Sequence, residues 1–281
     1  MTMHVDLVVD VLRTEERLIQ RALGAWARVR LVDVSAEPIE VGGKRVDAAV
    51  VRPISMYRAV YAAGSYEASR VFTVNSSEAI IYAGDKMLSY TRMRAFRVPV
   101  PRTYYAATPE AALKAGSELG YPVVVKSPVG SWGRLVSRAR SPEKLEQIAR
   151  LRSMLPCSQQ RAMMVQEYLE LGGSDIRCIV VYDSLVGCIV RRAGRGEWRS
   201  NVALGASVEP LEPDQELEDI VLRAARAIGG FFVSIDVFET KTRGYIVNEV
   251  NGVPEFKGFM RATGRNPAEE LSKALYWRLH H

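Results

Sequence analysis

The chain has 281 residues, of which 48% are hydrophobic and 25% are charged, as in an ordinary globular enzyme. No apolar run reaches the roughly 18 residues that a membrane-spanning helix needs, and the first ten residues lack the basic start of a signal peptide, so we expect a cytoplasmic protein without a membrane partner. The formal net charge of +6 fits either a solvated basic surface or an acidic partner, while no zinc-finger, RNA-recognition or basic-zipper pattern indicates nucleic acid.

The first 84 residues alternate short apolar runs with segments that carry apolar residues at helical spacing. Strands are expected at residues 5–9, 29–34, 48–51 and 71–75, and helices at 14–25 and 55–68. Strands that alternate with helices are typical of a doubly wound, mostly parallel sheet. We therefore expect an N-terminal α/β domain over residues 1–84.

An α+β unit is expected next, over residues 85–164. A helix over residues 85–96 ends before Pro99, because proline cannot continue a helix. Thr108-Pro109 and Ser141-Pro142 are typical helix starts, and the strands expected around them cover residues 103–106, 123–126 and 135–137.

The remaining residues, 165–281, carry mostly antiparallel strand patterns. Asp183-Ser184 is short enough to form a two-residue turn between two of the strands. The strands are expected at 164–169, 176–182, 185–191, 233–239 and 245–251, and the helices at 215–228 and 267–279. The three units together predict an α/β protein in which a parallel-sheet domain precedes two α+β domains.

The three cysteines form no metal-binding pattern. Cys157, Cys178 and Cys188 are scattered and contain no Cys-x-x-Cys pair, which argues against a zinc site or a disulfide framework. Cys178 and Cys188 lie in consecutive apolar segments and are expected in the core. A bridge between them is left open by the sequence.

Three oxygen-bearing side chains are predicted to gather on one hairpin. If the turn centres on Thr242 and Arg243, Asp236 and Glu249 lie directly opposite each other, and Asn251 points to the same face as Glu249. Opposed carboxylates repel unless a cation lies between them, and oxygen ligands without His or Cys suit Mg²⁺. The simpler interpretation, solvated surface acids, is disfavoured by the apolar flanking residues.

A lysine and a glycine-rich turn follow one another in the central unit. Lys126 ends the apolar strand, where its ammonium group can project toward a ligand. The turn over residues 130–133 exposes backbone N–H groups that can hold phosphate. The pattern is not a P-loop, and a glycine turn by itself usually only joins two strands.

Two further segments have ordinary interpretations when each is taken alone. The residues from Gln166 to Leu169 end a strand whose backbone can meet an adenine edge, but the pattern fits any strand. Arg191, Arg192 and Arg199 can hold a carboxylate or phosphoryl group through paired hydrogen bonds, but they also fit a solvated basic hairpin.

Taken in order, these motifs resemble the ATP-grasp superfamily and, within it, the RimK-like amino-acid ligases. Any one motif is weak, whereas the ordered set is specific and covers the chain from about residue 75 to its end. The set comprises Asp85-Lys86, residues 122–126, Gln166-Glu167-Tyr168, Asp175-Ile176-Arg177, Arg199-Ser200-Asn201, Asp236 and Glu249-Val250-Asn251. Residues 130–134 and 248–257 are similar to the ligases that act on the amino-group carrier protein of lysine and arginine biosynthesis (the LysX and ArgX type).

The resemblance implies an ATP-grasp fold and a role for each matching residue. Mg²⁺, as two ions, would be held by Asp236, Glu249 and Asn251. Lys126, Arg191 and Arg199 would act in catalysis, with Arg192 an alternative to Arg191. ATP would be bound by Lys86, Lys126, Gly130, Ser131, Trp132, Gly133, Arg134, Gln166, Glu167, Tyr168, Leu169, Asp175 and Asn201. The substrate would be bound by Arg177, Arg191, Val202, Ala203, Glu255, Phe256, Lys257, Gly258 and Phe259.

The implied reaction uses ATP as co-substrate and passes through an acyl phosphate. It would join the α-amino group of glutamate to the side-chain carboxylate of the C-terminal glutamate of a small acidic carrier protein. Gly258-Phe259 resembles the glutamate-selecting form, whereas the aminoadipate-selecting form has Asn at the first position. An enzyme that takes α-aminoadipate, or both amino acids, stays an alternative, and a homo-oligomer is expected.

Two further functions remain open at this point. One is a RimK-like glutamate ligase acting on another protein or peptide, for which the basic charge of the chain disfavours a basic ribosomal target. The other is a nucleotide-binding regulatory protein without turnover, and the full set of metal ligands and lysines counts against it.

Overall fold

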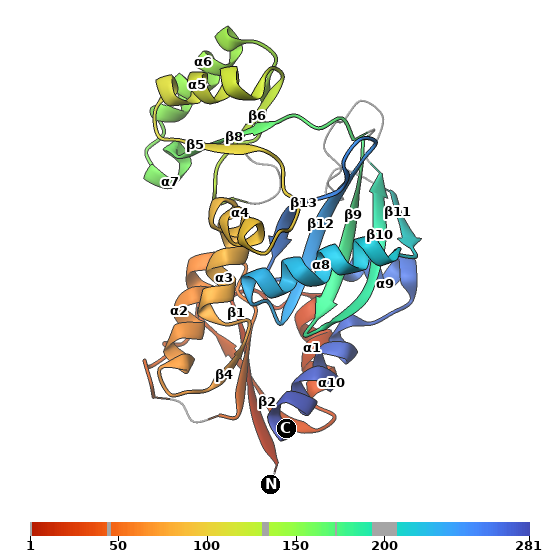
Figure 1. Cartoon of the computed structure of the whole chain (residues 1–281). Coiled ribbons are helices and arrows are strands. Elements are labelled where there is room, and N and C mark those ends of the chain that lie inside the picture. Colours follow the sequence, from red (N-terminus) through yellow and green to blue (C-terminus); the bar gives the residue numbers. More distant parts are fainter. Residues whose placement is uncertain (1, 44–45, 131–134, 172, 193–206) are drawn as a thin grey trace.

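A computed structural model describes residues 2–43, 46–130, 135–171, 173–192 and 207–281. These residues form three sheets that follow one another along the chain, and Figure 1 shows the central sheet set above the other two. Among the described residues, no helix is long and apolar enough to cross a bilayer.

The N-terminal sheet is parallel, in the order β2-β1-β3-β4. Alternate residues of β1 enter two hydrophobic clusters: Val5 and Leu7 pack with α1, and Val8 packs with α2. Helices therefore cover both faces, and the expected doubly wound parallel sheet is confirmed. The elements are β1 (Met3–Val9), α1 (Thr14–Leu23), β2 (Ala27–Asp33), β3 (Ala48–Val51), α2 (Met56–Glu67), β4 (Phe72–Val74) and α3 (Ser77–Gly84).

The central sheet is antiparallel, in the order β5-β8-β6-β7. Helices α5 and α6 lie on the side turned away from the rest of the protein (Figure 1). The Thr108 and Ser141 hydroxyls cap these helices by accepting from the backbone three residues on, with proline at the first helical position, as expected. The elements are β5 (Thr103–Ala106), α5 (Pro109–Leu119), β6 (Val123–Lys126), β7 (Ser137–Ala139), α6 (Pro142–Ser153), α7 (Ser158–Arg161) and β8 (Met163–Glu167).

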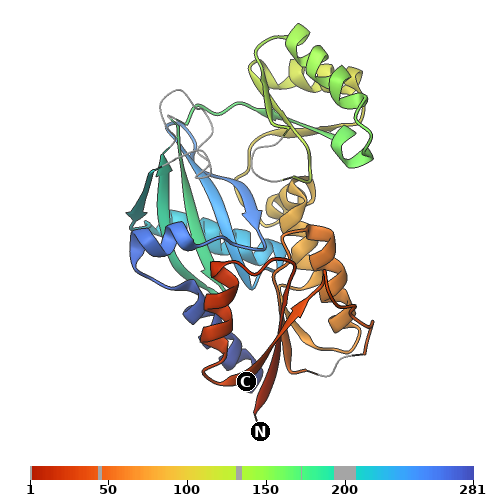
Figure 2. The same cartoon turned by 180° about the vertical axis from the view of Figure 1, so that it is seen from behind.

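The C-terminal sheet is antiparallel and buried on both faces, in the order β11-β10-β9-β12-β13. Helix α8 covers one face and α9 and α10 lie on the other side, as Figures 1 and 2 show from opposite directions. Asp214 caps the start of α8, and Gly229 ends it in the left-handed conformation that glycine adopts without strain. The elements are β9 (Ser174–Val181), β10 (Ser184–Arg192), β11 (Ser207–Leu211), α8 (Gln215–Ile228), β12 (Phe232–Thr240), β13 (Gly244–Asn251), α9 (Lys257–Thr263) and α10 (Pro267–His280).

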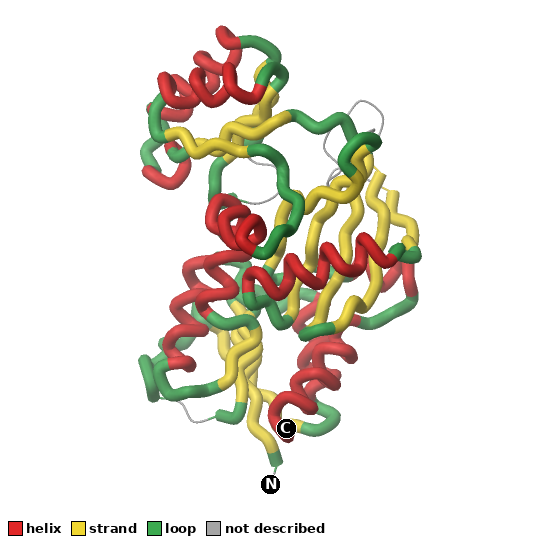
Figure 3. Tube along the Cα trace, viewed as in Figure 1, coloured by secondary structure: helices red, strands yellow, loops and turns green. Residues whose placement is uncertain are grey.

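Two joints hold the units together. The Asn75 side chain donates to the carbonyl oxygens of Phe232 and Gly252 and accepts from the amides of Phe231 and Phe232, so it ties the N-terminal sheet to the C-terminal one. Helix α4 (Lys86–Ala95) continues from α3 toward the central unit, and Figure 3 shows it next to the loops that lead there. Asp85 ends α3 and caps α4.

Some local expectations differ from the structure. The turn between β9 and β10 is Tyr182-Asp183 rather than Asp183-Ser184, because Ser184 already pairs with Val181. The strand expected at 135–137 begins at Ser137, since Leu135 has a φ of 55° and is not extended. The three-unit division stays a prediction, and its boundary at 164/165 falls inside β8, which pairs along its length in the central sheet.

The disulfide between Cys178 and Cys188, which the sequence neither predicts nor excludes, is present in the structure. Cys178 and Cys188 lie directly opposite each other on β9 and β10 and form a disulfide in the core, with a Cα–Cα distance of 4.1 Å. Cys157 is a free, exposed thiol.

Candidate active site

The carboxylates of the last hairpin lie where the sequence predicts, although for a more complicated reason. Asp236 pairs with Glu249. Thr240 pairs with Gly244, however, so the turn centres on Thr242 alone, and the predicted centre was half a residue off. A bulge that places Asn248 as an extra residue on β13 shifts the register back and restores the predicted pair.

Glu249 and Asn251 form a half-exposed group of oxygen donors. The Asn251 amide nitrogen donates to Glu249 Oε1 at 3.3 Å, so the two side chains share one face of β13 as expected. Lys86 Nζ lies 3.4 Å from the other carboxylate oxygen of Glu249. A carboxylate and an amide oxygen at a half-exposed strand end fit the ligands that Mg²⁺ prefers.

Asp236 is buried, and its carboxylate is held by two arginines. Arg177 donates from Nε and Nη2 to the two carboxylate oxygens at 2.7 and 2.8 Å, and Arg191 Nη2 lies 2.9 Å from Oδ2. Burial by itself would raise the pKa of Asp236, but the charges of Arg177 and Arg191 outweigh it and hold the pKa well below its ordinary value. The opposed carboxylates therefore do not by themselves require a metal, because arginine supplies the positive charge.

Arg177 and Arg191 direct one hydrogen bond to Asp236 Oδ1 and two to Oδ2, and a carboxylate offers about four acceptor sites, so a cation need not displace either arginine. Among the described residues, no three His, Cys, Asp or Glu side chains gather as a ready-made metal site. Glu249 and Asn251 thus fit the expected Mg²⁺ as half-exposed oxygen donors, and Asp236 fits it through the remaining acceptor site of Oδ1. The metal role of all three stays a prediction.

Arg191 is the centre of the same buried network. Its Nε donates to Asp175 Oδ1 at 2.7 Å, and its Nη2 donates to Asp175 Oδ2 as well as to Asp236. Burial would lower the pKa of Arg191, but the charges of Asp236 and Asp175 raise it above its ordinary value. Arg192 is exposed and pairs with Glu209 at 3.4 Å, so of the two arginines left open by the sequence it is Arg191 that faces the site.

Lys126 is a buried cation at the end of β6. Its Nζ lies 3.4 Å from the Asn248 amide oxygen, on the bulge of β13, and 3.5 Å from the Tyr90 hydroxyl. Burial and the nearby charge of Lys86 lower the pKa of Lys126 to about 7, with Glu249 opposing them. Lys126 is therefore a poorly solvated ammonium group whose charge a bound anion would stabilise.

Tyr90 joins the central unit to the last hairpin, and sequence reasoning missed it. Its hydroxyl donates to the carbonyl oxygen of Asn248 at 2.7 Å and accepts from Gln166 Nε2 at 3.1 Å. Gln166 also donates to Thr103 Oγ1 at 3.0 Å. The signal was present: Tyr90 lies four residues after Lys86 on α4, and residues at this spacing share a helix face.

The other residues expected to bind the nucleotide lie around the same junction. Lys86 Nζ donates to the carbonyl oxygen of Gly130 at 2.6 Å. Glu167 accepts from the Arg102 amide and from Arg243 Nη1, both at 2.7 Å. Tyr168 accepts from Arg138 Nη1 at 3.0 Å, and Leu169 is half-buried. Outside the described residues lie Ser131, Trp132, Gly133, Arg134, Arg199, Asn201, Val202 and Ala203.

The segment expected to select the amino acid has both exposed and buried members. Glu255 is exposed and Gly258 half-buried, and Lys257 begins α9. Phe256 and Phe259 are buried in the cluster that also contains residues of α1 and α10. A buried Phe259 can form the floor of a pocket but presents almost no surface of its own, and its selecting role stays a prediction.

Comparisons with known proteins identify the family. Residues 83–275 match the model of the RimK-like ATP-grasp domain. The chain is 44% identical to "Glutamate--LysW ligase ArgX" of Sulfolobus acidocaldarius over 96% of each chain. It is 36% identical to "Alpha-aminoadipate--LysW ligase LysX" of Sulfurisphaera tokodaii, over 97% of this chain and 98% of that protein.

A solved structure has the same fold over nearly its whole length. The RimK domain ATP-grasp protein of Sphaerobacter thermophilus superposes with a TM-score of 0.76 at 25% identity, over 97% of this chain and 99% of that one. ATP-grasp ligases use ATP and Mg²⁺, which agrees with the lysines and oxygen donors that meet at the last hairpin. The chain belongs to the RimK-like ATP-grasp family of ATP-dependent carboxylate–amine ligases.

Proposed function

We propose that the enzyme joins the α-amino group of glutamate to the side-chain carboxylate of the C-terminal glutamate of a small acidic carrier protein of the LysW type, in arginine biosynthesis. The observation that carries the proposal is the 44% identity, over 96% of both chains, to a protein named glutamate–LysW ligase. ATP would be cleaved to ADP and phosphate. The net charge of +6 suits an acidic partner.

The buried and half-buried cations of the site would stabilise the charge that develops on the phosphates. Lys86 and Lys126 would contact them, because both ammonium groups lie at the meeting point of α4, β6 and β13. Transfer of the γ-phosphoryl group to the carrier carboxylate would give an acyl phosphate. The amine of the amino acid would then attack its carbonyl carbon and release phosphate.

The Mg²⁺ ligands would be Glu249 and Asn251, with Asp236 joining them. Bound Mg²⁺, as two ions, would neutralise phosphate charge. Arg177 and Arg191 would then face the reacting carboxylate or phosphoryl group, because they contact the Asp236 carboxylate directly. The homo-oligomer and the cytoplasmic location stay predictions.

A second substrate has a specific observation in its favour. The 36% identical relative is named an α-aminoadipate–LysW ligase, so an enzyme that takes α-aminoadipate, or both amino acids, is the alternative. Gly258-Phe259 favours glutamate by its resemblance to the glutamate-selecting form.

The test is an ADP-release assay with purified enzyme, ATP, Mg²⁺ and a LysW-type carrier, in which glutamate and α-aminoadipate are compared at equal concentration. We expect ADP release that needs both carrier and glutamate, and a carrier whose mass rises by one glutamyl group. Faster turnover with α-aminoadipate would favour the alternative. ADP release that is the same without any amino acid would refute the ligase reaction on this substrate pair.

A further inference from the structure

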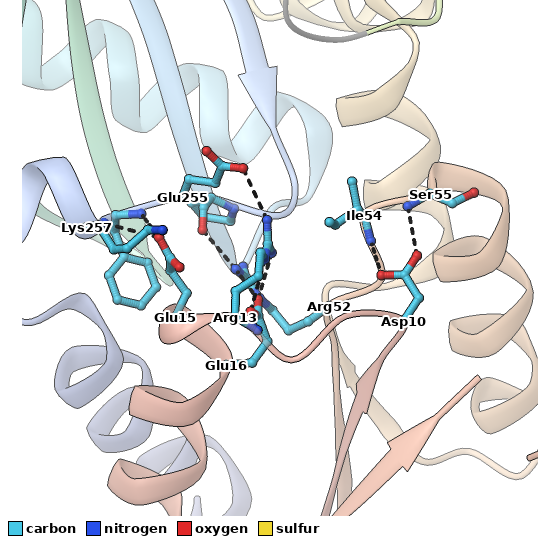
Figure 4. Close-up of polar contacts among 11 residues, drawn as sticks. Asp10, Arg13, Glu15, Glu16, Arg52, Ile54, Ser55, Glu255 and Lys257 are labelled. Carbon is cyan, nitrogen blue, oxygen red and sulfur yellow. Dashed lines mark hydrogen bonds and ion pairs between the residues drawn. The ribbon is translucent and has the colours of Figure 1, made fainter. Parts of the chain in front are cut away.

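A buried charged cluster of the N-terminal unit lies against the segment 254–257. Arg52 follows β3 and Glu15 lies in the first turn of α1, and both side chains are fully buried. They follow the carboxyl ends of the neighbouring parallel strands β3 and β1, the edge of an α/β sheet at which ligands commonly bind. Figure 4 shows both side chains directed at the segment that precedes α9.

Glu15 holds this segment by its backbone. One carboxylate oxygen accepts from the amide of Phe256 at 3.2 Å and from the amide of Lys257 at 3.3 Å. Phe256 is the N-cap residue of α9, and its side chain makes no capping hydrogen bond. Glu15 therefore supplies, from 241 residues away, an acceptor for two amides at the start of α9 that have no partner within the helix.

Arg52 hydrogen-bonds the same segment at its other end, at Pro254. Its Nη2 donates to the carbonyl oxygen of Pro254 at 2.9 Å and to Glu16 Oε1 at 3.0 Å. Arg13 donates from Nε and Nη2 to the two carboxylate oxygens of Glu16, and from Nη1 to Glu255 Oε1 at 3.2 Å. Glu15 and Arg52 thus hydrogen-bond the backbone between Pro254 and Lys257, and Arg13 adds a contact to the side chain of Glu255.

We propose that Glu15 and Arg52 are positioning residues that set the segment 254–257, and through it the amino-acid pocket expected at residues 255–259. The inference rests on the proposed function for the identity of the pocket. Glu15 Oε1 and Arg52 Nη2 hydrogen-bond backbone groups of this segment, and Arg52 is also paired with Glu16. Glu15 Oε2 and Arg52 Nη1 are buried without a hydrogen-bond partner among the described residues, so the segment supplies much of the compensation that these buried charges receive. Neither residue touches the reacting atoms, so each acts through the segment that it holds.

The main test is Glu15→Ala, with Glu15→Gln as the conservative variant. Loss of the acceptor should raise the KM for glutamate about tenfold or more, with the KM for ATP and kcat nearly unchanged, because ground-state binding is what the segment provides. In Glu15→Gln the side-chain amide oxygen can still accept from both backbone amides, so this conservative variant should recover most of the wild-type KM.

A matched control is available at the same sheet edge. Asp10 accepts from the amides of Ile54 at 2.9 Å and Ser55 at 3.4 Å, so its carboxylate hydrogen-bonds backbone amides as that of Glu15 does. These amides lie outside the segment 254–257 (Figure 4). Asp10→Ala should lower stability but leave the KM for glutamate within about twofold of wild type. An equal rise in KM for Asp10→Ala and Glu15→Ala would reduce Glu15 to a structural residue and overturn the proposal.

A second measurement separates this inference from the proposed function. Amide hydrogen exchange of residues 255–259 should become faster in Glu15→Ala and stay unchanged in Asp10→Ala, without any substrate. Unchanged exchange in Glu15→Ala refutes the positioning role even if glutamate proves to be the substrate. If wild type does not use glutamate, the proposed function fails while the exchange result still decides the positioning. Should Glu15→Ala not fold, Arg52→Lys, which shortens the reach to Pro254, is expected to give the same changes.

Discussion

The ammonium nitrogen of Lys126 lies 3.5 Å from the Tyr90 hydroxyl, and both groups are buried. A neutral hydroxyl and, at 3.4 Å, a neutral amide oxygen face this charge. Burial and the charge of Lys86 accordingly lower the pKa of Lys126 to about 7. Near pH 8 this lysine is therefore expected to be mostly neutral in the nucleotide-free enzyme, so that phosphate binding is accompanied by protonation of Lys126.

The first prediction is that Mg-ADP binding takes up a proton at pH 8. Phosphate next to Lys126 favours the charged form and raises its pKa, so affinity should fall by up to about tenfold per pH unit above pH 7. Calorimetric titrations in two buffers of different ionisation enthalpy measure the proton uptake. The control is Lys126→Met, which should bind more weakly and show a smaller uptake. Equal uptake by both proteins would assign the proton to another group.

The second prediction is that Lys126→Met stabilises the fold while it abolishes turnover. The pKa of Lys126 is lower in the folded protein than in the unfolded chain, so the cost of its charge is full below pH 7 and disappears as pH rises toward 10.5. At pH 6.5 the variant should be more stable by up to about 5 kcal/mol, since the pKa of Lys126 falls from 10.5 to about 7 and each pKa unit corresponds to about 1.4 kcal/mol. Denaturant unfolding at pH 6.5 and 9 should show the difference shrinking, and a difference that grows with pH would contradict the assigned shift.

Hydrophobic periodicity and proline signals were enough to predict most elements of the fold from sequence. Residues 48–51, 123–126 and 215–228 were predicted with the bounds that the structure has. Helix α3 was missed because it ends at Asp85, where α4 begins, so two helices follow each other without a loop to separate them. β11 was missed as well, because Ser207–Leu211 has one edge pairing and little apolar character.

The site was harder to predict, because its charges are paired across strands. Equal distance from an assumed turn centre placed Asp236 opposite Glu249, but only the three-dimensional register reveals the bulge at Asn248. Likewise no sequence spacing indicates that Arg177 and Arg191, from β9 and β10, share one carboxylate. Local patterns report which residues share a face, whereas contacts between separate strands and helices depend on packing.

The third prediction contrasts two carboxylates of the last hairpin. Asp236→Asn leaves the buried Arg191 and the half-buried Arg177 with less compensation, and removing one partner of a buried pair costs about 3–5 kcal/mol. Glu249→Gln changes a half-exposed group, whose surface pair contributes about 0–1 kcal/mol. Both variants should lose most ligase activity.

Thermal unfolding and the Mg²⁺ dependence of ADP release check this contrast. We expect a large fall in Tm for Asp236→Asn and a small one for Glu249→Gln. Equal Tm values for the two variants would mean that the arginine network contributes little to stability. Full activity of Glu249→Gln at ordinary Mg²⁺ concentrations would remove Glu249 from the expected metal ligands.

The fourth prediction concerns the bridge between Cys178 and Cys188, which joins neighbouring strands of the C-terminal sheet ten residues apart. Closing a loop of this length in the unfolded chain stabilises a protein by about 3 kcal/mol in the chain-entropy model. Reductant, or the Cys188→Ala variant, should therefore lower the denaturant midpoint, whereas Cys157→Ser should leave it unchanged because that thiol is free and exposed. Mass spectrometry of the unreduced protein after thiol alkylation counts the free cysteines. One alkylated cysteine per chain supports the bridge, and three, with a midpoint insensitive to reductant, would show that the two thiols stay reduced.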